Sequence, residues 1–429
     1  MDIGFFLDNR HVRGTDFRRP WEGNPGTGAV EYLHAALPYF IAHYGDGAVR
    51  TRIFASDTAM LPPDVPAHPV QTITDAARQA KAAGVDYLVF RPRMSEEDGI
   101  LDVLDELQLP SIGRAALTPH PDHVRRMAKC GAFKALVCVG REQYDYLMDT
   151  PLHNKLAYID NGVQVSSCLQ DPAPAKGPRL VVYMGALVLQ KGFHVLAEAW
   201  PKVLQRIPDA RLSVIGSLTM YNESAQLGPL GDADEHYERT HIMQYLCGPD
   251  GALHPSVTFH GRMGREKYEI LQRALVGVAN PTGQTETCCV SAVEMAACKT
   301  AVVSGAYYAL LDTVRHNETG LLGRSGGDLA ANICRLLEDP DRAIAMGKAG
   351  HRRAMEQYDF SVVVPRWIDL FGHLSRHSIP VPAGRTKNLS RHLKAVRLVN
   401  RFFQKCIGSV LQWPSLQEVT HFAQRLRAK

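Results

Sequence analysis

Short apolar runs alternate along the chain with segments in which apolar residues recur at helical spacing. In the first part of the chain, four runs predict buried strands: IGFFLD (3–8), RTRIFAS (50–56), DYLVFRP (86–92) and KALVCVG (134–140). Between them, residues 29–45 and 74–84 carry apolar positions at the spacing of helices. Alternation of this kind predicts βαβ units around a mainly parallel sheet.

The pattern is interrupted at residues 171–178, DPAPAKGP, whose three prolines indicate a linker. A second alternation follows, with strand-like runs at 179–185, 210–217, 256–261, 274–281 and 299–305, and helix-like segments at 193–207 and 328–339. We therefore expect two doubly wound α/β lobes, 1–170 and 179–365. Ligands of such folds bind beyond the carboxyl ends of the strands, so the joined lobes would place these ends across a cleft.

Two segments depart from this alternation. Residues 218–255 form an insertion rich in Gly and acids, which we expect to be irregular, and residues 366–429 are largely helical by pattern. The formal net charge of +4 hides an asymmetry, because residues 385–429 hold ten Lys or Arg and one acid. A basic segment of this kind could contact an anionic membrane, nucleic acid or an acidic patch on its own protein.

Composition excludes several classes of protein. The nine cysteines show no C-x-x-C spacing, which argues against a metal cage or a disulfide framework and favours a reducing compartment. The opening MDIGFFLDN lacks the basic start and long apolar run of a signal peptide, and no stretch approaches the roughly 18 apolar residues of a membrane span. We therefore expect a cytoplasmic protein.

A candidate phosphate-binding loop lies in VVYMGALVLQKGFHVLAEAW (181–200). A strand ends at Gly185, a loop carries Lys191 and Gly192, and a helix follows. Glycine lets the backbone approach a ligand, a helix amino terminus offers free N–H groups, and a lysine adds a point charge that suits a diphosphate. The spacing is neither a P-loop nor G-x-G-x-x-G, and an ordinary loop with a solvated lysine is the alternative.

A second glycine turn, NPGTGAVEYL (24–33), lies between the first strand and the first helix. Gly26 and Gly28 would allow a tight turn at the cleft. The alternative is a bare turn before a helix.

Two acids stand seven residues apart in GQTETCCVSAVEM (283–295). If residues 286–294 were all helical, Glu286 and Glu294 would lie roughly 12 Å apart along the axis and would contact different parts of an elongated ligand. The alternative is that Ser291 and Glu294 form a capping box while Glu286 is a solvated loop acid.

Taken in order, these stretches resemble the family 4 glycosyltransferases, whose fold is the two-lobed GT-B type. The resemblance runs from GTGAVEYL and YIDNGV in the first lobe through the segment 181–217, SVTFHG and TETCCVSAVEMAACKTAVV to LLDTVRHNETGLL and YDFSVVVPRWIDLF. It implies two Rossmann-like lobes facing a cleft: an acceptor lobe (1–170), a linker (171–178) and a donor lobe (179–365). The helices of 366–429 would pack back on the first lobe or face a membrane.

The resemblance also assigns roles to the site residues. Glu286 would lie near the donor sugar and the reacting carbon, and Glu294 would bind the nucleotide ribose. Lys191 would neutralise the diphosphate, and the backbone N–H groups of Thr287, Cys288 and Cys289 would face sugar and phosphate oxygens. No metal and no separate cofactor are implied. The acids of DAD (232–234) resemble the metal motif of the other glycosyltransferase fold, and we expect them to be solvated charges.

The chain departs from the family pattern at several positions. Ala186 stands where the family usually has Arg, and Arg262 could supply the missing phosphate contact. The paired glycine of the first lobe reads Gly28-Ala29, and Lys299-Thr300-Ala301 replaces the usual Gly-Thr-Pro. His120 is the candidate for the family's first-lobe histidine, with His123 and Ala116 as the alternatives for that place.

The implied activity is that of a retaining glycosyltransferase, with a nucleoside diphosphate sugar as donor and a hydroxyl acceptor such as a glycan, polysaccharide or lipid-linked molecule. Nucleic acid is not an expected partner. The amphipathic basic segment 391–405 could rest on anionic lipid at the inner membrane face. The alternatives are an epimerase or phosphorylase on the same fold, or a nucleotide-sugar binding protein without activity.

Overall fold

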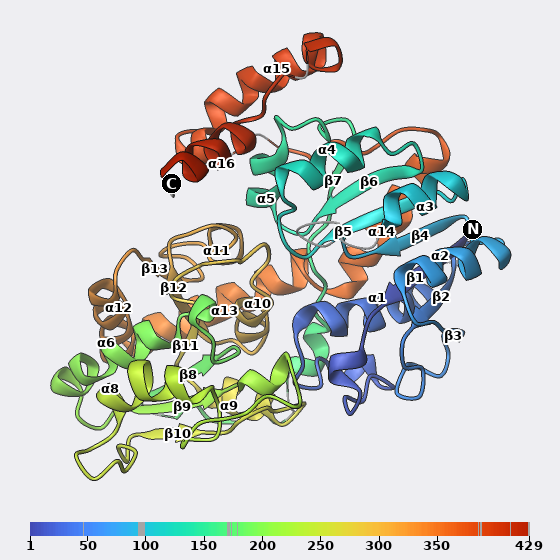
Figure 1. Cartoon of the computed structure of the whole chain (residues 1–429). Helices are drawn as coiled ribbons and strands as arrows, with labels where there is room; N and C mark the ends of the chain where they lie inside the picture. The colour runs from blue at the N-terminus through green and yellow to red at the C-terminus, as the bar shows by residue number, and fades with distance from the viewer. Residues whose placement is uncertain are drawn as a thin grey trace.

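The protein folds into two parallel-sheet lobes joined by C-terminal helices, as seen in the computed structural model (Figure 1). The structure describes the chain except residues 46, 93–98, 170, 171, 173, 178, 385, 387, 412, 428 and 429. Both sheets are parallel throughout, as the strand–helix alternation predicts. None of the helices in these described segments is both long and apolar enough to cross a bilayer.

The first lobe holds a seven-stranded sheet in the order β3-β2-β1-β4-β5-β6-β7. Its strands are β1 (Asp2–Leu7), β2 (Arg50–Ala55), β3 (Ala67–Pro69), β4 (Tyr87–Phe90), β5 (Ser111–Ala115), β6 (Phe133–Cys138) and β7 (Leu156–Tyr158). Its helices are α1 (Ala29–Tyr44), α2 (Ile73–Ala82), α3 (Ile100–Glu106), α4 (Pro121–Lys129) and α5 (Arg141–Leu147). The four predicted strands are confirmed. The sequence pattern did not indicate β3, β5 and β7, because β3 and β7 are three residues long and β5 carries a glycine and an arginine.

The second lobe holds a six-stranded sheet in the order β10-β9-β8-β11-β12-β13. Its strands are β8 (Leu180–Met184), β9 (Arg211–Ile215), β10 (Val257–Phe259), β11 (Val276–Ala279), β12 (Ala301–Gly305) and β13 (Gly320–Gly323). Its longer helices are α6 (Phe193–Arg206), α9 (Lys267–Arg273), α10 (Val290–Ala297), α11 (Leu310–Thr313), α12 (Gly326–Glu338) and α13 (Pro340–Gln357). All five predicted strands are present, and the short edge strand β13 is the one the pattern missed.

The insertion 218–255 is less irregular than its composition predicts. It contains α7 (Glu235–Tyr237), a π-helical turn (Glu238–Met243) and α8 (Gln244–Leu246) in direct succession. The expectation that its DAD acids are solvated is wrong for Asp232, which is buried and whose pKa burial raises to about 6. Asp234 caps α7 by accepting the N–H of Tyr237 at 3.0 Å, so this acid serves local structure.

Three helices follow the second lobe and return to the first. The helix α14 (Phe360–Ser375) packs on α1, α15 (Lys394–Leu411) on α5, and α16 (Leu416–Arg427) on α4. In Figure 1, α15 and α16 lie beside α4 and α5 at the end of the first lobe. The crossing near residue 360 is tight: a Cβ on Gly162 would lie 2.3 Å from the ring of Phe360, and Phe360 stacks on Phe40 with ring centroids 3.9 Å apart.

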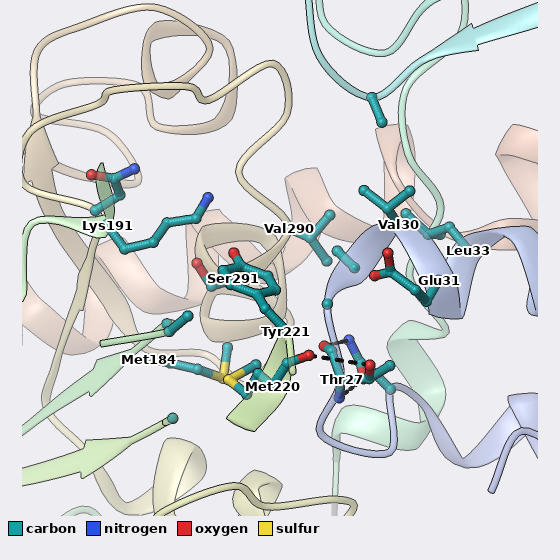
Figure 2. Close-up of a pocket in the computed structure, with 18 of the residues that line it drawn as sticks. Thr27, Val30, Glu31, Leu33, Met184, Lys191, Met220, Tyr221, Val290 and Ser291 are labelled. Atoms are coloured by element: carbon teal, nitrogen blue, oxygen red, sulfur yellow. Dashed lines mark hydrogen bonds between the residues drawn. The ribbon is translucent and has the colours of Figure 1, made fainter. Parts of the chain in front are cut away.

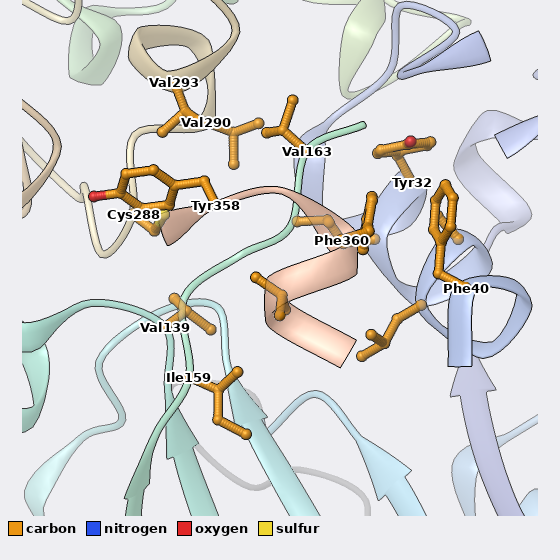
Figure 3. Packing of buried hydrophobic residues seen from close by; sticks show 14 of the residues in the cluster. Tyr32, Phe40, Val139, Ile159, Val163, Cys288, Val290, Val293, Tyr358 and Phe360 are labelled. Carbon is orange, nitrogen blue, oxygen red and sulfur yellow. The ribbon is translucent and has the colours of Figure 1, made fainter. Parts of the chain in front are cut away.

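One hydrophobic core extends through both lobes. Figure 3 shows Tyr32, Val139 and Ile159 of the first lobe in the same cluster as Val290 and Val293 of α10. Of the predicted linker 171–178, residues 171, 173 and 178 lie outside the described residues. The rest is attached to the second lobe, because Gly177 donates its N–H to the carbonyl of Arg273 at 2.7 Å. The lobes are therefore packed against one another in this structure.

Candidate active site

A cavity of about 610 Å³ lies between the lobes, beyond the carboxyl ends of β8 and β11. The strand order of each sheet reverses at such a point, β1 beside β4 and β8 beside β11, which is where doubly wound folds bind ligands. Figure 2 shows Lys191 on the side of the second lobe and Glu31 on the side of the first, with Tyr221 between them. Eight of the predicted site residues line this cavity: Gly26, Gly28, Gly185, Lys191, Glu286, Thr287, Cys288 and Glu294.

Lys191 is held by the turn between β8 and α6. Gly192 adopts a left-handed backbone with φ of 73°, and a Cβ there would lie 2.9 Å from the backbone nitrogen of Thr282, so this position requires glycine. The carbonyl of Lys191 accepts the hydroxyl of Tyr183 at 2.9 Å. Its ammonium nitrogen Nζ lies 2.6 Å from Oε1 of Glu286. The alternative of a solvated loop lysine is therefore wrong.

Glu286 sits in the loop between β11 and α10, and its side chain is only 8% exposed. Asn280 donates Nδ2–H to the same oxygen at 2.8 Å. Burial would lower the pKa of Lys191, but the Glu286 carboxylate outweighs that effect and holds the pKa above its usual value. Lys191 is therefore charged at neutral pH. Glu286, held by Lys191 and Asn280, is not the solvated loop acid of the alternative.

Glu294 lies inside α10, which begins at Val290 rather than at residue 286. The capping-box alternative is wrong: Cys289 is the N-cap residue, and Glu294 contacts α9 instead. Its Oε1 accepts the hydroxyl of Tyr268 at 3.0 Å and lies 2.9 Å from Nζ of Lys267. This carboxylate is buried and fixed, and it faces the cavity.

The chain before α10 carries backbone N–H groups at the cavity, where Thr287 and Cys288 are lining residues. Within the described part of the chain, the N–H groups of Thr287, Cys288 and Cys289 have no hydrogen-bond acceptor. The thiols of Cys288 and Cys289 are buried, and burial raises the pKa of both. Thr287 donates its hydroxyl to the carbonyl of Ala116 in the first lobe at 2.8 Å. The arrangement can bind an anion and is braced by the opposite lobe.

The glycine turn of the first lobe allows the lobes to approach closely. A Cβ on Gly26 would lie 2.6 Å from the carbonyl oxygen of Met263, and one on Gly28 would lie 2.4 Å from Glu31 Oε2. Gly28 donates its N–H to the carbonyl of Met220 at 3.3 Å. The bare-turn alternative is therefore too simple, because the turn contacts the second lobe.

Three predicted residues do not line the cavity. Cys289 is the buried N-cap residue of α10. Arg262 is not among the residues lining the cavity and pairs with Glu223 at 2.9 Å. His120 is the N-cap residue of α4, lies 2.8 Å from His421 through the Nε2 atoms, and lines a neighbouring cavity. Ala116 directly follows β5 and lines the main cavity, so it occupies the place at the strand end. Functional roles for Arg262 and His120 stay predictions.

Several cavity residues were not anticipated from the sequence. Arg114 on β5 is buried, donates to Asn161, and has its pKa lowered to about 10 by burial. Glu31 on α1 lies 3.3 Å from His11 and raises the pKa of that histidine through their hydrogen bond. An arginine within a buried strand was the available signal for Arg114, whereas nothing in the pattern marked Glu31.

No group of three or more His, Cys, Asp or Glu is placed to hold a metal ion in the part of the chain that the structure describes. The cavity is lined by charged side chains and, at Thr287 and Cys288, by backbone N–H groups that can donate hydrogen bonds. This combination can bind a phosphorylated ligand by direct contact.

Residues 169–353 match the family model of the glycosyl transferases group 1. Residues 169–353 are therefore a group 1 glycosyl transferase domain. The match confirms the resemblance drawn from the sequence. It also places Lys191, Glu286 and Glu294 inside the matched domain.

Two curated relatives are mannosyltransferases of Mycobacterium tuberculosis. The GDP-mannose-dependent alpha-(1-6)-phosphatidylinositol monomannoside mannosyltransferase is 28% identical over 232 residues, which cover 50% of this chain and 55% of the relative. The phosphatidyl-myo-inositol mannosyltransferase is 31% identical over 220 residues, which cover 48% of this chain and 50% of the relative. The chain therefore spans about half the length of the curated relatives it matches.

Solved structures establish the fold over most of the chain. A glycosyltransferase from Rickettsia africae superposes with a TM-score of 0.65 at 12% identity, covering 88% of this chain and 99% of that one. Sucrose-phosphate synthase of Thermosynechococcus elongatus superposes with a TM-score of 0.64 at 18% identity, covering 88% of this chain and 100% of that one. The group 1 domain is thus one half of a GT-B fold, as the sequence predicted.

Proposed function

We propose that the protein is a retaining glycosyltransferase that moves a sugar from a nucleoside diphosphate sugar to a hydroxyl acceptor. The observation that carries the proposal is the partly buried Lys191–Glu286 pair in the same cavity as the buried Glu294. The second lobe would bind the donor and the first lobe would contribute to the acceptor side.

In this proposal the donor lies along the loop that precedes α10. Lys191 and the free N–H groups of residues 287–289 bind the diphosphate, because opposite charge and unpaired donors both favour an anion there. Lys267 and Tyr268 both contact Oε1 of Glu294, which leaves Oε2 to accept a ribose hydroxyl. A carboxylate oxygen is well suited to that contact because it accepts more than one hydrogen bond.

The chemistry requires charge stabilisation at both ends of the breaking bond. Positive charge develops at the anomeric carbon and negative charge on the departing diphosphate. Lys191 stabilises the negative end in a site where Glu286 already fixes its position. Glu286 lies beside the reacting carbon, and the leaving phosphate accepts the proton of the acceptor hydroxyl.

GDP-mannose is the first donor to test, because the relatives include a protein named as GDP-mannose-dependent. A true donor at 100 times its Kd should stabilise the fold by about 2.7 kcal/mol. Thermal shifts with GDP-mannose and UDP-glucose, followed by donor hydrolysis without acceptor, test the proposal. Hydrolysis that releases the sugar with its anomeric configuration retained supports it. Binding without any turnover would indicate a non-catalytic binding protein, and an altered sugar stereocentre would indicate an epimerase.

A peripheral membrane contact belongs to the same proposal. Two charges at the start of α15 face the protein, with the side chains of Lys394 and Arg397 1% and 4% exposed, while Val399 and Phe402 are 60% and 64% exposed. On α16, Phe422 is also 64% exposed. This orientation is the reverse of a helix that packs by its apolar face.

We infer that this apolar face rests on anionic lipid, with exposed Lys405 and Arg425 beside it. Co-sedimentation with vesicles containing phosphatidylinositol tests it. The double substitution Phe402→Ser and Phe422→Ser should release the protein from the vesicles, whereas Val381→Ser, at an exposed site outside these helices, should not. Equal binding of the wild type, the double variant and Val381→Ser to the vesicles would refute the membrane contact.

A further inference from the structure

A second cavity, of about 470 Å³, adjoins the first. Glu286 and Thr287 line both cavities, so the two cavities meet at these residues. The proposed function puts Glu286 beside the reacting carbon. Its walls come from the loop before α4 and from α5 in the first lobe, from residues 308 and 309 of the second lobe, and from the C-terminal arm, defined here as residues 388–427 without 412.

The C-terminal arm is fixed to the first lobe by buried charges. Arg397 pairs with Asp149 at 2.6 Å and Lys394 with Asp145 at 3.2 Å, and all four side chains are at most 4% exposed. Asp149 also accepts the N–H of Leu416 at the start of α16, at 2.8 Å. Removing one partner of a buried pair costs several kcal/mol, so this wall of the cavity is firmly held.

The lining combines apolar and polar side chains, and its carboxylates and its arginine are paired. Glu142 pairs with Lys394, and Arg397 is engaged by Asp149. Glu286 pairs with Lys191. The other polar groups are amides, hydroxyls and the imidazoles of His120 and His421, whose Nε2 atoms lie 2.8 Å apart. An aromatic surface accompanies them, in which Tyr308 stacks on His392 with centroids 5.4 Å apart. A phosphorylated ligand would require uncommitted cations, whereas a sugar ring can place its C–H face on the tyrosine and its hydroxyls on the amides.

Two buried acceptor atoms at this cavity lack a donor among the residues that the structure describes. Gln417 donates Nε2–H to the carbonyl of Pro119 at 2.8 Å, but its Oε1 has no hydrogen-bond partner although the residue is 6% exposed. Glu142 Oε2 is likewise buried without a hydrogen bond, and the nearest ring nitrogen, of His392, lies 3.7 Å away. Buried polar atoms are normally satisfied, so these two are suited to accept hydroxyl protons from a ligand.

The backbone at the same place is strained. Tyr308, His392 and Leu393 all have positive φ, at 44°, 48° and 53°. Such conformations are unfavourable for residues other than glycine and are concentrated where ligands bind. Here they bring the stacked rings to the cavity wall.

We propose that the second cavity binds the acceptor, and that the acceptor presents a neutral sugar or polyol there. The proposal rests on the glycosyltransferase function above and names its acceptor class. The reacting hydroxyl passes Glu286 and Thr287 and forms the new bond to the anomeric carbon. The bond from that carbon to the diphosphate breaks, and the hydroxyl proton leaves with the diphosphate. The C-terminal arm is thereby part of the acceptor site.

A pair of substitutions on α16 tests this assignment. Thr420 is exposed and lines the cavity, whereas Val419 is exposed on the same helix and does not. Thr420→Trp should fill the cavity, and Val419→Trp serves as the matched control. The full-length variants are assayed for donor hydrolysis and for transfer to octyl mannoside, octyl glucoside and octyl mannoside 6-phosphate, with the donor identified by thermal shift.

The expected result is transfer to a neutral octyl glycoside that falls at least tenfold in Thr420→Trp and is unchanged in Val419→Trp, with donor hydrolysis equal in all proteins. Equal transfer by both variants would place the acceptor elsewhere. Preference for the phosphorylated glycoside, or hydrolysis without transfer to any glycoside, would overturn the acceptor class. If no donor is hydrolysed at all, the glycosyltransferase function itself fails.

Discussion

Replacing Lys191 by Gln removes the one charge that the proposed chemistry assigns to the leaving diphosphate. The change keeps a polar side chain and leaves Asn280 donating to Glu286 at 2.8 Å. A preorganised donor of this kind typically contributes 10²–10³ in rate, or about 2.7–4 kcal/mol. We therefore expect donor hydrolysis and transfer to fall together by roughly that factor, because both pass through the same departing diphosphate.

The effect on folding should be smaller. The Lys191–Glu286 pair is 2.6 Å long with side chains 22% and 8% exposed, so it is partly reached by water. A fully buried pair that loses one partner costs about 3–5 kcal/mol. With Asn280 still bound to the carboxylate, we expect about 1–2 kcal/mol of lost unfolding free energy. A rate loss that exceeds the stability loss separates catalysis from folding.

The assay is single-turnover donor hydrolysis followed from pH 6 to 9, together with denaturant unfolding. Lys202→Gln is the matched control, because Lys202 is an exposed lysine on α6 of the same lobe. Glu286 holds the pKa of Lys191 above its usual value, so the lysine is charged across this range and the ratio of rates should not vary with pH. Adding Glu286→Gln to Lys191→Gln should cost much less than the two single losses combined.

A rate within threefold of wild type would refute the reasoning, as would a ratio that changes steeply between pH 6 and 9. The first result would mean that the diphosphate leaves without this cation. The second result would mean that Lys191 loses its proton within the assay range, so that Glu286 does not keep the pKa of Lys191 above its usual value.

Three further substitutions test other parts of the molecule. Lys267→Met leaves Glu294 buried without its cation and should lower the unfolding free energy by about 3–5 kcal/mol in urea titration; a loss under about 1 kcal/mol would contradict the pairing. Burial raises the pKa of Asp312 to about 7, so its proton stabilises the fold fully below the unfolded pKa of about 3.9, and this contribution is lost as pH rises through 7. Wild type should lose about 1–3 kcal/mol more stability than Asp312→Asn between pH 5 and pH 8, and parallel curves would exclude the shift. A Cβ on Gly140 would lie 2.1 Å from a backbone oxygen of the second lobe, so Gly140→Ala should impair transfer at least tenfold, as measured by product formation. Gly131→Ala, whose nearest neighbour is 3.5 Å away, should not, and equal activity would show that the lobes need not approach this closely.

The spacing of apolar residues along the chain determined most of the strands and helices and their order. Strands such as 3–8 and 179–185 are apolar runs bounded by turns, and the helices between them show regular spacing, so nearest-neighbour chemistry along the chain suffices to predict parallel sheets. The pattern failed at β3 and β13, which are three and four residues long, because a strand that short carries no periodicity.

The sequence also marked the residues of the site without showing how they act. Lys191 and Glu286 were both anticipated, yet their pairing joins loops 95 residues apart. Glu294 matched a capping box by spacing, but α10 begins one residue before Ser291, so the carboxylate turns toward α9 instead. The position at which α10 begins thus excluded the capping-box interpretation of Glu294, which the spacing of the residues alone had left open.

The C-terminal arm shows most clearly how the tertiary structure decides what the sequence leaves open. Its charge and amphipathic spacing were visible in the sequence, but not that α15 directs Arg397 and Lys394 inward to Asp149 and Glu142 and its apolar residues outward. That orientation depends on acids of α5 and of the turn that follows it, which lie about 250 residues earlier in the chain. Which face of a helix is buried depends on the surface it meets, and that surface exists only once the lobes have folded.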